Sequence, residues 1–409
     1  MKVLFVNQFY YPDVAATAQI MADLAEHLVE RGHEVHVLCS RGQYDDGSGR
    51  PTPRRELHRG VHIHRVTAPG FGKKHLVGRM LDYAGFHLLT GLRLLAVGWR
   101  YDAVVTLTTP PLIGLYGTAV KWLTLGRTRH VCWAMDLHPD CEFELGMWSR
   151  RHPLYRGFDG LNGLHFRKAH AAVVLGEAMA DRLRAKGVAD RRLHVIPVWS
   201  RSDRIDARPL GDSPLRAEHG LADRFVVMYS GNAGLIHSFD AVCEAMRRLD
   251  DDDRIRFLFV GGGRRLAEVE QFAREHGLSN LVTLPYFPRE RLNDSLAMGD
   301  VHLVTLRQGM AGVAVPCKTY GIMAAGRAVI HIGPVAGETA DHVREAGAGV
   351  VIPVEAPDAA DMLEATIRRL AAAPDEAAAM GRRGREKMQA RFDRPVCCGQ
   401  WTHLLESLR

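Results

Sequence analysis

FVVMYSGNAGLIHSFD, residues 225–240, is the stretch of sequence that decides the fold most directly. Its first five residues form an apolar run, which is typical of a buried strand in a parallel sheet. The segment GNAGLIHS then predicts a turn, and a helix is expected over 239–249. Small residues after a strand let backbone amides approach an anion, so this turn suits a diphosphate, although a plain tight turn would read the same way.

The alternation of strand, turn and helix continues toward the C-terminus. Further apolar runs predict strands at 256–260, 281–284, 301–306, 328–332 and 350–352. The last roughly 50 residues are rich in alanine and arginine and read as helix. The second half of the chain therefore predicts one open α/β sheet.

The first half repeats this pattern. Residues 3–6 form a buried strand, and Ile20, Leu24 and Leu28 recur every four residues, as on one helix face. Further strands are predicted at 35–38, 61–66, 103–107, 131–135, 171–175 and 194–197. We predict an α/β protein with two doubly wound, Rossmann-like domains. Such sheets bind ligands at the carboxyl ends of their strands, so a cleft between the two domains is the expected site.

Length and composition place the boundary between the domains. The chain has 409 residues, more than one hydrophobic core usually supports. The polar segment 199–216 contains two prolines and no periodicity, and it predicts an interdomain linker. We therefore expect an N-terminal acceptor-side domain over 1–200 and a C-terminal nucleotide-sugar-binding domain over 201–389, with a last helix at 390–409 packed back on the first domain.

Charge and cysteine usage bear on location. The net charge is +6, a modest excess that a solvated surface explains and that also suits an anionic partner. Seven scattered cysteines without metal-ligand spacing indicate reduced thiols. The apolar run at the N-terminus is short for a signal peptide, and 86–99 is too short to span a bilayer. These features predict a cytoplasmic protein.

Three further segments carry residues that could act in chemistry. Lys318 lies in VPCKTY before a predicted helix, where an ammonium suits a phosphate, although a lone lysine is often only solvated. Glu338 follows a strand and a Gly-Pro turn, where a carboxylate can bind a ribose diol or simply favour a helix N-terminus. In WAMDLHPD, Asp136 and His138 close a strand and could orient or deprotonate an acceptor hydroxyl, or be polar groups satisfied by backbone.

Taken together, these segments resemble the GT-B-type retaining glycosyltransferases, in particular the large family that builds bacterial polysaccharides. The resemblance covers nearly the whole chain. It rests on MKVLFVNQFYYPDVAATAQ, RGHEV, VVMYSGNAGLIHSFD, VPCKTYGIMAAGRAVI and GET. The segment DLHPD is similar to the DLWPE-type segment of members that make capsule, O-antigen or colanic-acid-like polymers.

The resemblance implies transfer of a sugar, with retention, from a UDP-sugar or, less favoured, a GDP-sugar to a glycan or polyprenyl-diphosphate-linked acceptor. No cofactor and no divalent metal would be needed, because positive charge would stabilise the leaving diphosphate. The implied catalytic residues are Asp136 and His138. The other implied site residues are Gly231, Asn232, Gly234, His237 and Lys318 for the diphosphate, Tyr320, Glu338 and Thr339 for the ribose or donor sugar, and Thr17 and Gln19 for the acceptor side.

The sequence departs from this family at several positions. Many relatives have two glutamates seven residues apart, where this chain has Val313 and Gly321. Many have an arginine at the position of Asn232 and a lysine where this chain has His237 and Ser238. These losses keep two alternatives open: a noncatalytic nucleotide-sugar-binding or scaffold protein, and a nonhydrolysing UDP-sugar epimerase.

A basic segment predicts a membrane surface as a further partner. Seven basic residues precede the amphipathic stretch 81–99: Arg54, Arg55, Arg59, Arg65, Lys73, Lys74 and Arg79. Basic residues beside an apolar face can hold a protein on anionic lipid, and a core-packed helix beside a solvated loop is the alternative. A peripheral position on the inner face of the cytoplasmic membrane is thus expected, and nucleic acid is not, because aromatic and basic residues do not interleave.

Overall fold

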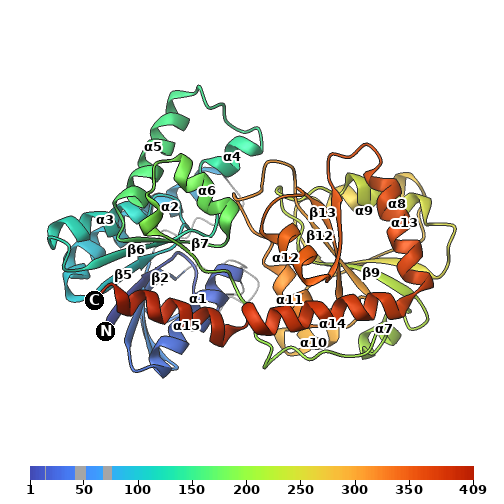
Figure 1. The fold of residues 1–409 in the computed structure, drawn as a ribbon. Coiled ribbons are helices and arrows are strands. Elements are labelled where there is room, and N and C mark those ends of the chain that lie inside the picture. The colour runs from blue at the N-terminus through green and yellow to red at the C-terminus, as the bar shows by residue number, and fades with distance from the viewer. Residues whose placement is uncertain (14, 42–51, 68–75) are drawn as a thin grey trace. The chain divides into compact units, whose positions relative to one another are not determined.

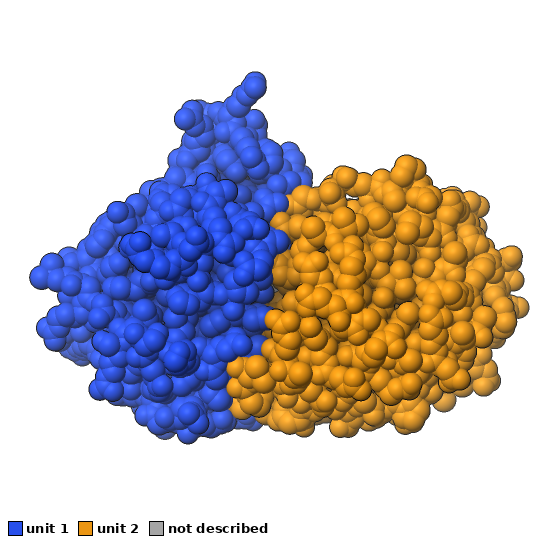
Figure 2. Space-filling view, in the orientation of Figure 1, with its two compact units in different colours: residues 1–197, 312–314, 397–409 blue, residues 198–311, 315–396 orange. Residues whose placement is uncertain are grey.

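The computed structural model describes residues 1–13, 15–41, 52–67 and 76–409, with the side chains of 76–82 left out. The chain divides into two compact units (Figures 1 and 2). Unit 1 comprises 1–197, 312–314 and 397–409, and unit 2 comprises 198–311 and 315–396. Lys73 and Lys74 of the predicted basic segment lie outside the described residues, and the side chain of Arg79 does too.

Unit 1 is built on an eight-stranded sheet in the order β3-β4-β2-β1-β5-β6-β7-β8. All its neighbouring strands are parallel except the edge pair β3 and β4. The strands are β1 (Lys2–Val6), β2 (Glu34–Ser40), β3 (Arg55–His58), β4 (Val61–Val66), β5 (Ala103–Thr106), β6 (Arg129–Trp133), β7 (Ala171–Val174) and β8 (Leu193–Val195).

The helices of unit 1 follow the strands that they cover. They are α1 (Ala16–Glu30), α2 (Leu76–Val97), α3 (Gly114–Leu123), α4 (Asp140–Glu144), α5 (Pro153–Lys168), α6 (Glu177–Ala185) and the short turns η2 (Gly98–Arg100) and η3 (Asp190–Arg192). The predicted face of α1 is confirmed, since Ile20, Leu24 and Leu28 are buried. Most residues of α15 (Arg394–Ser407) also belong to unit 1, where Trp401 packs against Trp133 with ring centroids 4.5 Å apart.

Unit 2 is built on a six-stranded parallel sheet in the order β11-β10-β9-β12-β13-β14. Its strands are β9 (Phe225–Asn232), β10 (Ile255–Gly262), β11 (Leu281–Leu284), β12 (Val301–Thr305), β13 (Ala328–Gly333) and β14 (Gly349–Pro353). Its helices are α7 (Pro214–Glu218), α8 (Asp240–Arg248), α9 (Leu266–Glu275), α10 (Leu292–Leu296), α11 (Lys318–Ala324), α12 (Glu338–Ala346), α13 (Ala359–Ala372) and α14 (Pro374–Arg391), with the turn η4 (Arg289–Arg291).

Each sheet reverses its strand order at one point. In unit 1, β1 lies between β2 and β5, and in unit 2, β9 lies between β10 and β12. Consecutive connections leave opposite sides of such a strand, so the loops at its carboxyl end separate and leave room for a ligand. The prediction of two doubly wound α/β domains is confirmed, and it places the candidate site residues at these two edges.

One local expectation was wrong, and one edge strand was not predicted. The segment 199–216 is not a free linker, because it packs into unit 2, where the buried Arg216 pairs with Asp300 at 2.9 Å. Arg327 also donates hydrogen bonds to the backbone oxygens of Arg208 and Pro209. The strand β3 was missed because its sequence, RELH, has no apolar run; it is held by antiparallel pairing with β4 at the sheet edge.

Candidate functional site

The carboxyl edge of unit 2 is formed by glycine-rich ends of β9 and β10. Pairing of β9 continues past the predicted end of the strand, with Gly231 beside Gly261 and Asn232 beside Gly262. A Cβ atom on Gly261 would lie 2.5 Å from the oxygen of Gly231, so only glycine allows these strands to approach at this point. The predicted turn therefore starts at Ala233, and Gly231, Gly261 and Gly262 contribute backbone without side chains of their own to this edge.

Lys318 lies at this edge. It is the first residue of α11, and its Nζ lies 3.5 Å from the centroid of the Tyr229 ring. A Cβ atom on Gly231 would be 3.4 Å from the same Nζ. No hydrogen-bond partner of Nζ exists among the described residues, and burial lowers the pKa of the ammonium well below its ordinary value. An anion bound beside Nζ would offset this desolvation and stabilise the charged form of the amine, so the position favours an anionic ligand.

His237 does not add a second positive charge to this edge. Its ring is buried, and Nδ1 lies 2.6 Å from the oxygen of Thr305. Desolvation and the nearby Lys318 lower its pKa to about 3, so the imidazole is neutral near pH 7. The side chain that was expected to contact the diphosphate is thus turned into the core, beside the ring of Tyr229.

Arg265 is a cation at this edge that the sequence analysis missed. Its backbone nitrogen donates to the oxygen of Ala233, and its Nη1 donates to the oxygen of His237, 3.0 Å away. Its Nη2 pairs with Glu268 at 3.0 Å. The signal was present in the sequence GGGRR at 261–265, but without the three-dimensional pairing of β9 and β10 nothing linked that segment to the turn.

Asn232 and Gly234 lie next to each other in the turn, as predicted. The Tyr229 hydroxyl donates to the oxygen of Asn232, 3.0 Å away, and the Asn232 amide would lie 3.4 Å from a Cβ atom on Gly234. Tyr286, a further residue not predicted, is exposed and its ring would lie 3.0 Å from a Cβ atom on Gly261. The glycine edge is therefore flanked by one buried and one exposed aromatic ring.

The three residues predicted for the ribose or donor sugar lie on α11 and α12. Glu338 and Thr339 open α12, after Gly337 with φ of 123°, and both are buried. Tyr320 is buried as well, but its ring packs against Phe392, 5.3 Å away, and His342, 5.9 Å away. Glu338 and Thr339 thus occupy the predicted strand-to-helix turn, whereas the Tyr320 ring is part of the core.

The carboxyl edge of unit 1 carries Asp136, which follows β6. Its backbone nitrogen and that of Met135 both donate to the hydroxyl of Thr108. Desolvation raises the pKa of the half-buried Asp136 carboxyl, with a further increase from Glu142 and a decrease from His138. A carboxylate with a raised pKa is better suited to accept a proton than an exposed one.

His138 lies two residues further and is held by a carboxylate. Its Nδ1 is 2.7 Å from Glu142 of α4. Burial alone lowers the pKa of His138, but the hydrogen bond and charge of Glu142, together with Asp136 and Asp140, raise it above the ordinary value of 6.5. The neighbouring Asp140 is paired with Lys186, 2.8 Å away. The structure thus brings Asp136 and His138 into one network of paired charges.

Asn162 supports this network from α5. Its amide donates to the backbone oxygen of His138, and its Oδ1 lies 2.8 Å from Nε2 of His165. Nδ1 of His165 lies 3.3 Å from the thiol of Cys132, which completes a Cys-His-Asn arrangement like that of a nucleophilic enzyme. Burial, however, raises the pKa of Cys132 to about 12 and lowers that of His165 to about 3. These groups stay neutral and hold α5 against the sheet.

The acceptor-side candidates and the two positions lacking glutamate lie elsewhere. Thr17 and Gln19 lie in the first turn of α1 and are half-buried. Val313 is buried within unit 1, where its oxygen accepts from the backbone nitrogen of Leu137. A Cβ atom on Gly321 would have no neighbour within 4 Å.

Among the described residues, no group of three or more His, Cys, Asp or Glu side chains is arranged to hold a metal ion. No helix in the described part of the chain is long and apolar enough to cross a bilayer.

Comparisons with known proteins cover both units. The family described as "Glycosyl transferase 4-like domain" matches residues 16–199, and the family described as "Glycosyl transferases group 1" matches residues 213–387. WcaI of Escherichia coli (strain K12), assigned to the glycosyl transferases of colanic acid biosynthesis, is 27% identical over 90% of this chain and 92% of its own length. WbjE of Pseudomonas aeruginosa, assigned as a glycosyltransferase, is 26% identical over 71% of this chain and 72% of its own length.

Solved structures share the fold over the full length. Sucrose-phosphate synthase from Thermosynechococcus elongatus superposes with a TM-score of 0.77 at 18% identity, over 100% of this chain and 99% of that one. HepE of Anabaena, solved with UDP and glucose, gives 0.75 at 16% identity over 100% of both chains. WaaG, a glycosyltransferase involved in lipopolysaccharide biosynthesis, gives 0.73 at 16% identity, over 98% of this chain and 99% of that one. At these identities the superpositions show the fold alone.

Proposed function

Because this chain belongs to the GT-B glycosyltransferases of bacterial polysaccharide biosynthesis, we propose that it transfers a hexosyl group from a UDP-sugar, with retention. The acceptor is a growing glycan or a polyprenyl-diphosphate-linked sugar at the inner face of the cytoplasmic membrane. Neither a cofactor nor a divalent metal takes part. Support for UDP over GDP comes from the HepE structures, which were solved with UDP and with UDP-glucose.

The observation that carries the proposal is the buried Lys318 ammonium at the edge formed by Gly231. An unpaired buried cation destabilises a protein, and an anion bound next to it removes that cost. The bare glycine backbone beside it lets a diphosphate approach closely. As the bond between the anomeric carbon and the diphosphate breaks, negative charge grows on the leaving oxygen, and Lys318 stabilises that charge without a metal.

The network of unit 1 supports the acceptor half of the reaction. The acceptor hydroxyl oxygen forms the new bond to the anomeric carbon and loses its proton. Asp136, whose pKa is raised by desolvation, orients this hydroxyl and accepts the proton. His138, fixed by Glu142, provides a second polar contact for the acceptor. Glu338 and Thr339 provide the contacts to ribose or donor sugar from the start of α12.

A thermal-shift panel tests the donor. UDP, GDP, ADP and their common sugar conjugates are compared with and without EDTA, because a ligand that binds the native state raises its melting temperature. We expect a shift with UDP and UDP-sugars that EDTA leaves unchanged, and loss of that shift in Lys318→Ala. A thermal shift with GDP alone would identify a GDP-sugar as the donor in place of a UDP-sugar. A shift that EDTA abolishes would contradict metal independence.

Product analysis then separates transfer from its alternatives. With a donor that binds and a lipid-linked or oligosaccharide acceptor, we expect an elongated product with the anomeric configuration of the donor. Conversion of the UDP-sugar without any acceptor would identify an epimerase instead. Donor binding without turnover on any acceptor would identify a noncatalytic binding protein.

The peripheral membrane position is also part of the proposal. The outer face of α2 exposes Leu88, Leu92 and Leu95, while Phe86 and Leu94 on its inner face are buried. The stretch is therefore core-packed on one side and apolar toward solvent on the other. Flotation with phosphatidylglycerol-containing vesicles at low salt should carry the protein upward, and its absence from the lipid fraction would remove the membrane from the proposal.

A further inference from the structure

The connection between α4 and α5 stands out from the rest of unit 1. Residues 145–158, hereafter the α4–α5 projection, extend beyond the sheet and its covering helices (Figures 1 and 2). Its tip exposes apolar side chains: Met147 is 62% exposed and Leu154 is 67% exposed, with Trp148 beside them at 36%. Large apolar side chains that are exposed on a protruding tip indicate a contact with an apolar environment.

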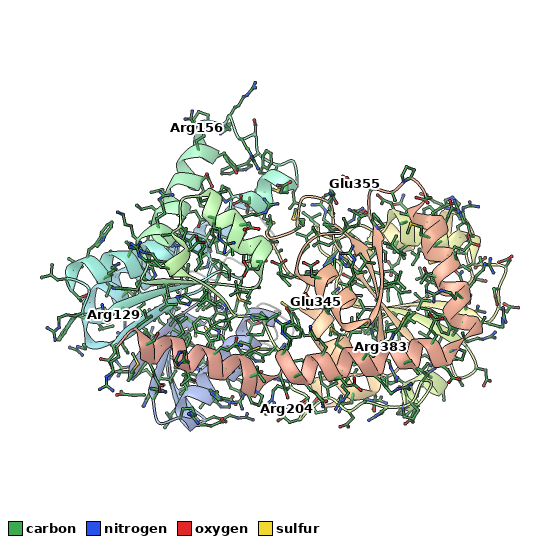
Figure 3. The ribbon with its side chains drawn as sticks, in the orientation of Figure 1. Arg129, Arg156, Arg204, Glu345, Glu355 and Arg383 are labelled. Carbon is green, nitrogen blue, oxygen red and sulfur yellow. The ribbon has the colours of Figure 1, made fainter. Side chains whose placement is uncertain are left out.

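The same projection is strongly cationic. Arg150, Arg151 and Arg156 are exposed, and Figure 3 shows Arg156 on the outer part of α5. Within 145–158 the sequence contains no aspartate or glutamate. In the described part of the chain none of these three guanidinium groups forms an ion pair, whereas Arg184 in the same unit pairs with three carboxylates. Their positive charge is therefore available to an anionic surface.

The projection is rigid at its base. Trp148 packs against Tyr155 and Phe158 with ring centroids 6.5 and 6.1 Å apart. Tyr155 is buried and its ring lies 5.9 Å from that of Phe143 on α4. The guanidinium carbon of Arg150 lies 4.3 Å from the centroid of the same Phe143 ring. An aromatic cluster thus fixes the tip, so that little ordering cost remains when it binds.

Both ends of the projection are tied to the candidate acceptor residues. On the α4 side, Glu142 holds the His138 ring at 2.7 Å. On the α5 side, Asn162 donates to the backbone oxygen of His138, and Lys186 bridges Asp159 to Asp140. A surface that binds the projection is consequently held at a fixed distance from His138.

We propose that the α4–α5 projection inserts its tip into the headgroup region of an anionic bilayer and thereby presents a lipid-linked acceptor to Asp136 and His138. The inference rests on the proposed function and names the bilayer as the partner that brings the acceptor. Tryptophan, methionine and leucine enter the interface, and the three arginines contact lipid phosphates. Each arginine near an anionic surface contributes about 1 kcal/mol, so the three together strengthen binding on the order of 100-fold.

Co-sedimentation measures this contribution. Vesicles of phosphatidylcholine, with or without phosphatidylglycerol, are mixed with the full-length protein and with two variants, Met147→Ser/Leu154→Ser and Arg150→Gln/Arg151→Gln/Arg156→Gln. We expect the triple variant to lose on the order of 100-fold in partitioning to the anionic vesicles and to lose its dependence on phosphatidylglycerol. The double variant should lose roughly tenfold, since two apolar side chains no longer enter the interface.

A matched control removes three exposed arginines of unit 2 by Arg274→Gln/Arg289→Gln/Arg382→Gln. It makes the same change in net charge away from the projection. We expect this control to keep most of the vesicle binding, because the partition depends on charge at the tip and not on net charge alone. Equal losses in the control and in the projection triple variant would overturn the proposal.

Activity gives a second readout. With a short water-soluble acceptor the projection variants should turn over as the wild type does, and with a polyprenyl-diphosphate acceptor embedded in vesicles their kcat/KM should fall in proportion to binding. A second membrane surface on α2 is tested with Leu88→Ser/Leu92→Ser. If this variant abolishes vesicle binding and the projection variants leave it intact, the inference is overturned. The inference is also overturned if light scattering shows that the wild type is a dimer without lipid and that the projection variants are monomers.

The same variants keep the two proposals apart. A UDP thermal shift preserved in the variants, together with lost vesicle binding, supports the projection and leaves the donor site unaffected. A wild type without any nucleotide shift contradicts the proposed function, whereas the vesicle result still decides whether the projection binds lipid.

Discussion

The carboxyl edges of the two sheets are built in opposite ways. In unit 2 the edge is a bare glycine backbone beside one buried cation, Lys318, that lacks a hydrogen-bond partner among the described residues. In unit 1 the edge carries acidic and imidazole groups that satisfy one another, as His138 does with Glu142 and Asp140 with Lys186. The same doubly wound fold therefore holds unbalanced positive charge in one unit and a balanced network in the other.

The difference shows how one architecture supports two roles. In unit 2, desolvation lowers the pKa of Lys318 in the free protein, and under the proposed function an anionic diphosphate stabilises its charged form. Balanced charge in unit 1 fixes the position of groups that, under the proposed function, meet a neutral hydroxyl. We expect substitutions in unit 2 to change nucleotide affinity and substitutions in unit 1 to change turnover.

Lys318→Met should have the largest effect, because it removes the basic group that distinguishes the edge of unit 2 from that of unit 1. We expect kcat/KM to fall roughly 100-fold or more, because the cation at the leaving group is lost. The free protein should become more stable by about 1 to 4 kcal/mol, since an unpaired buried charge is replaced by an apolar side chain. Kinetics and denaturant unfolding measure the two effects. Lys168→Met, on the exposed end of α5, is the matched control that should change neither.

The pH dependence of stability sharpens this test. Burial lowers the pKa of Lys318 in the folded chain, so above that pKa and below 10.5 the unfolded chain binds more protons. The stability of the free wild-type protein should therefore rise with pH across this window, and the stability of the Lys318→Met variant should rise less. A variant that follows the wild-type curve would show that the ammonium is not desolvated.

Asp136→Asn should lower kcat about 100-fold while leaving the thermal shift with UDP unchanged. The carboxylate can no longer accept the acceptor proton, whereas the donor edge of unit 2 is intact. Steady-state kinetics with saturating donor measures the effect, and Asp181→Asn, an exposed ion-pair residue of the same unit, serves as the comparison. Near-normal turnover would show that Asp136 is not the base, and the proton acceptor would then be the phosphate of the leaving group.

Gly263→Ala should weaken nucleotide binding roughly tenfold. Its φ is 119°, and an added Cβ would lie 2.5 Å from the backbone nitrogen of Ala233, so the turn must shift. Gly277, with φ of 63° and no neighbour within 4 Å of its Cβ position, is the matched glycine. Gly277→Ala should cost about 1 kcal/mol of stability and leave affinity alone. Titration calorimetry with UDP distinguishes the two, and equal affinities would contradict a role for the turn.

Glu142→Gln should have the smallest effect, a change of a few-fold in turnover at neutral pH. The hydrogen bond to Glu142 raises the pKa of His138, so its removal lowers that pKa. In the wild type, protonated His138 stabilises the folded protein below pH 6.5, and this contribution is lost as the pH rises through the raised pKa of His138 in the folded state. In the variant the contribution is lost at a lower pH. NMR titration of the His138 ring checks this. Glu144→Gln, which breaks the pair with Arg182, should not move it.

Sequence pattern was sufficient for most of the fold. Apolar runs such as 3–6 and 301–306 predict strands because parallel strands covered on both faces must be apolar. The edge strand β3 has no such run, and 199–216 looks polar although Arg216 is buried against Asp300. In both cases long-range pairing, which local composition does not encode, decided the outcome.

The candidate site was predictable in part for the same reason. Gly231 and Lys318 were both predicted as donor-site residues, and the structure brings them together. Gly231 lies at the carboxyl end of β9, and Lys318 follows β12 of the same sheet. The rings of His237 and Tyr320 point into the core, since rotamers depend on packing partners far away in the sequence. Arg265 was missed because its contact with the turn arises from the pairing of β9 with β10.

The point at which the chain enters and leaves unit 2 has a consequence for evolution. Ser200 and Asp393 form a bridge, in which the backbone nitrogen of Arg394 donates to the oxygen of Ser200. The segments by which the chain enters and leaves this unit thus lie side by side, as they do at the boundaries of an inserted domain. Residues 198–396, which contain all of unit 2 and the short unit 1 segment 312–314, can be regarded as an inserted segment whose two ends are adjacent. Under the proposed function, recombination at that pair of positions would exchange the donor-binding part of the enzyme and keep the acceptor-binding part.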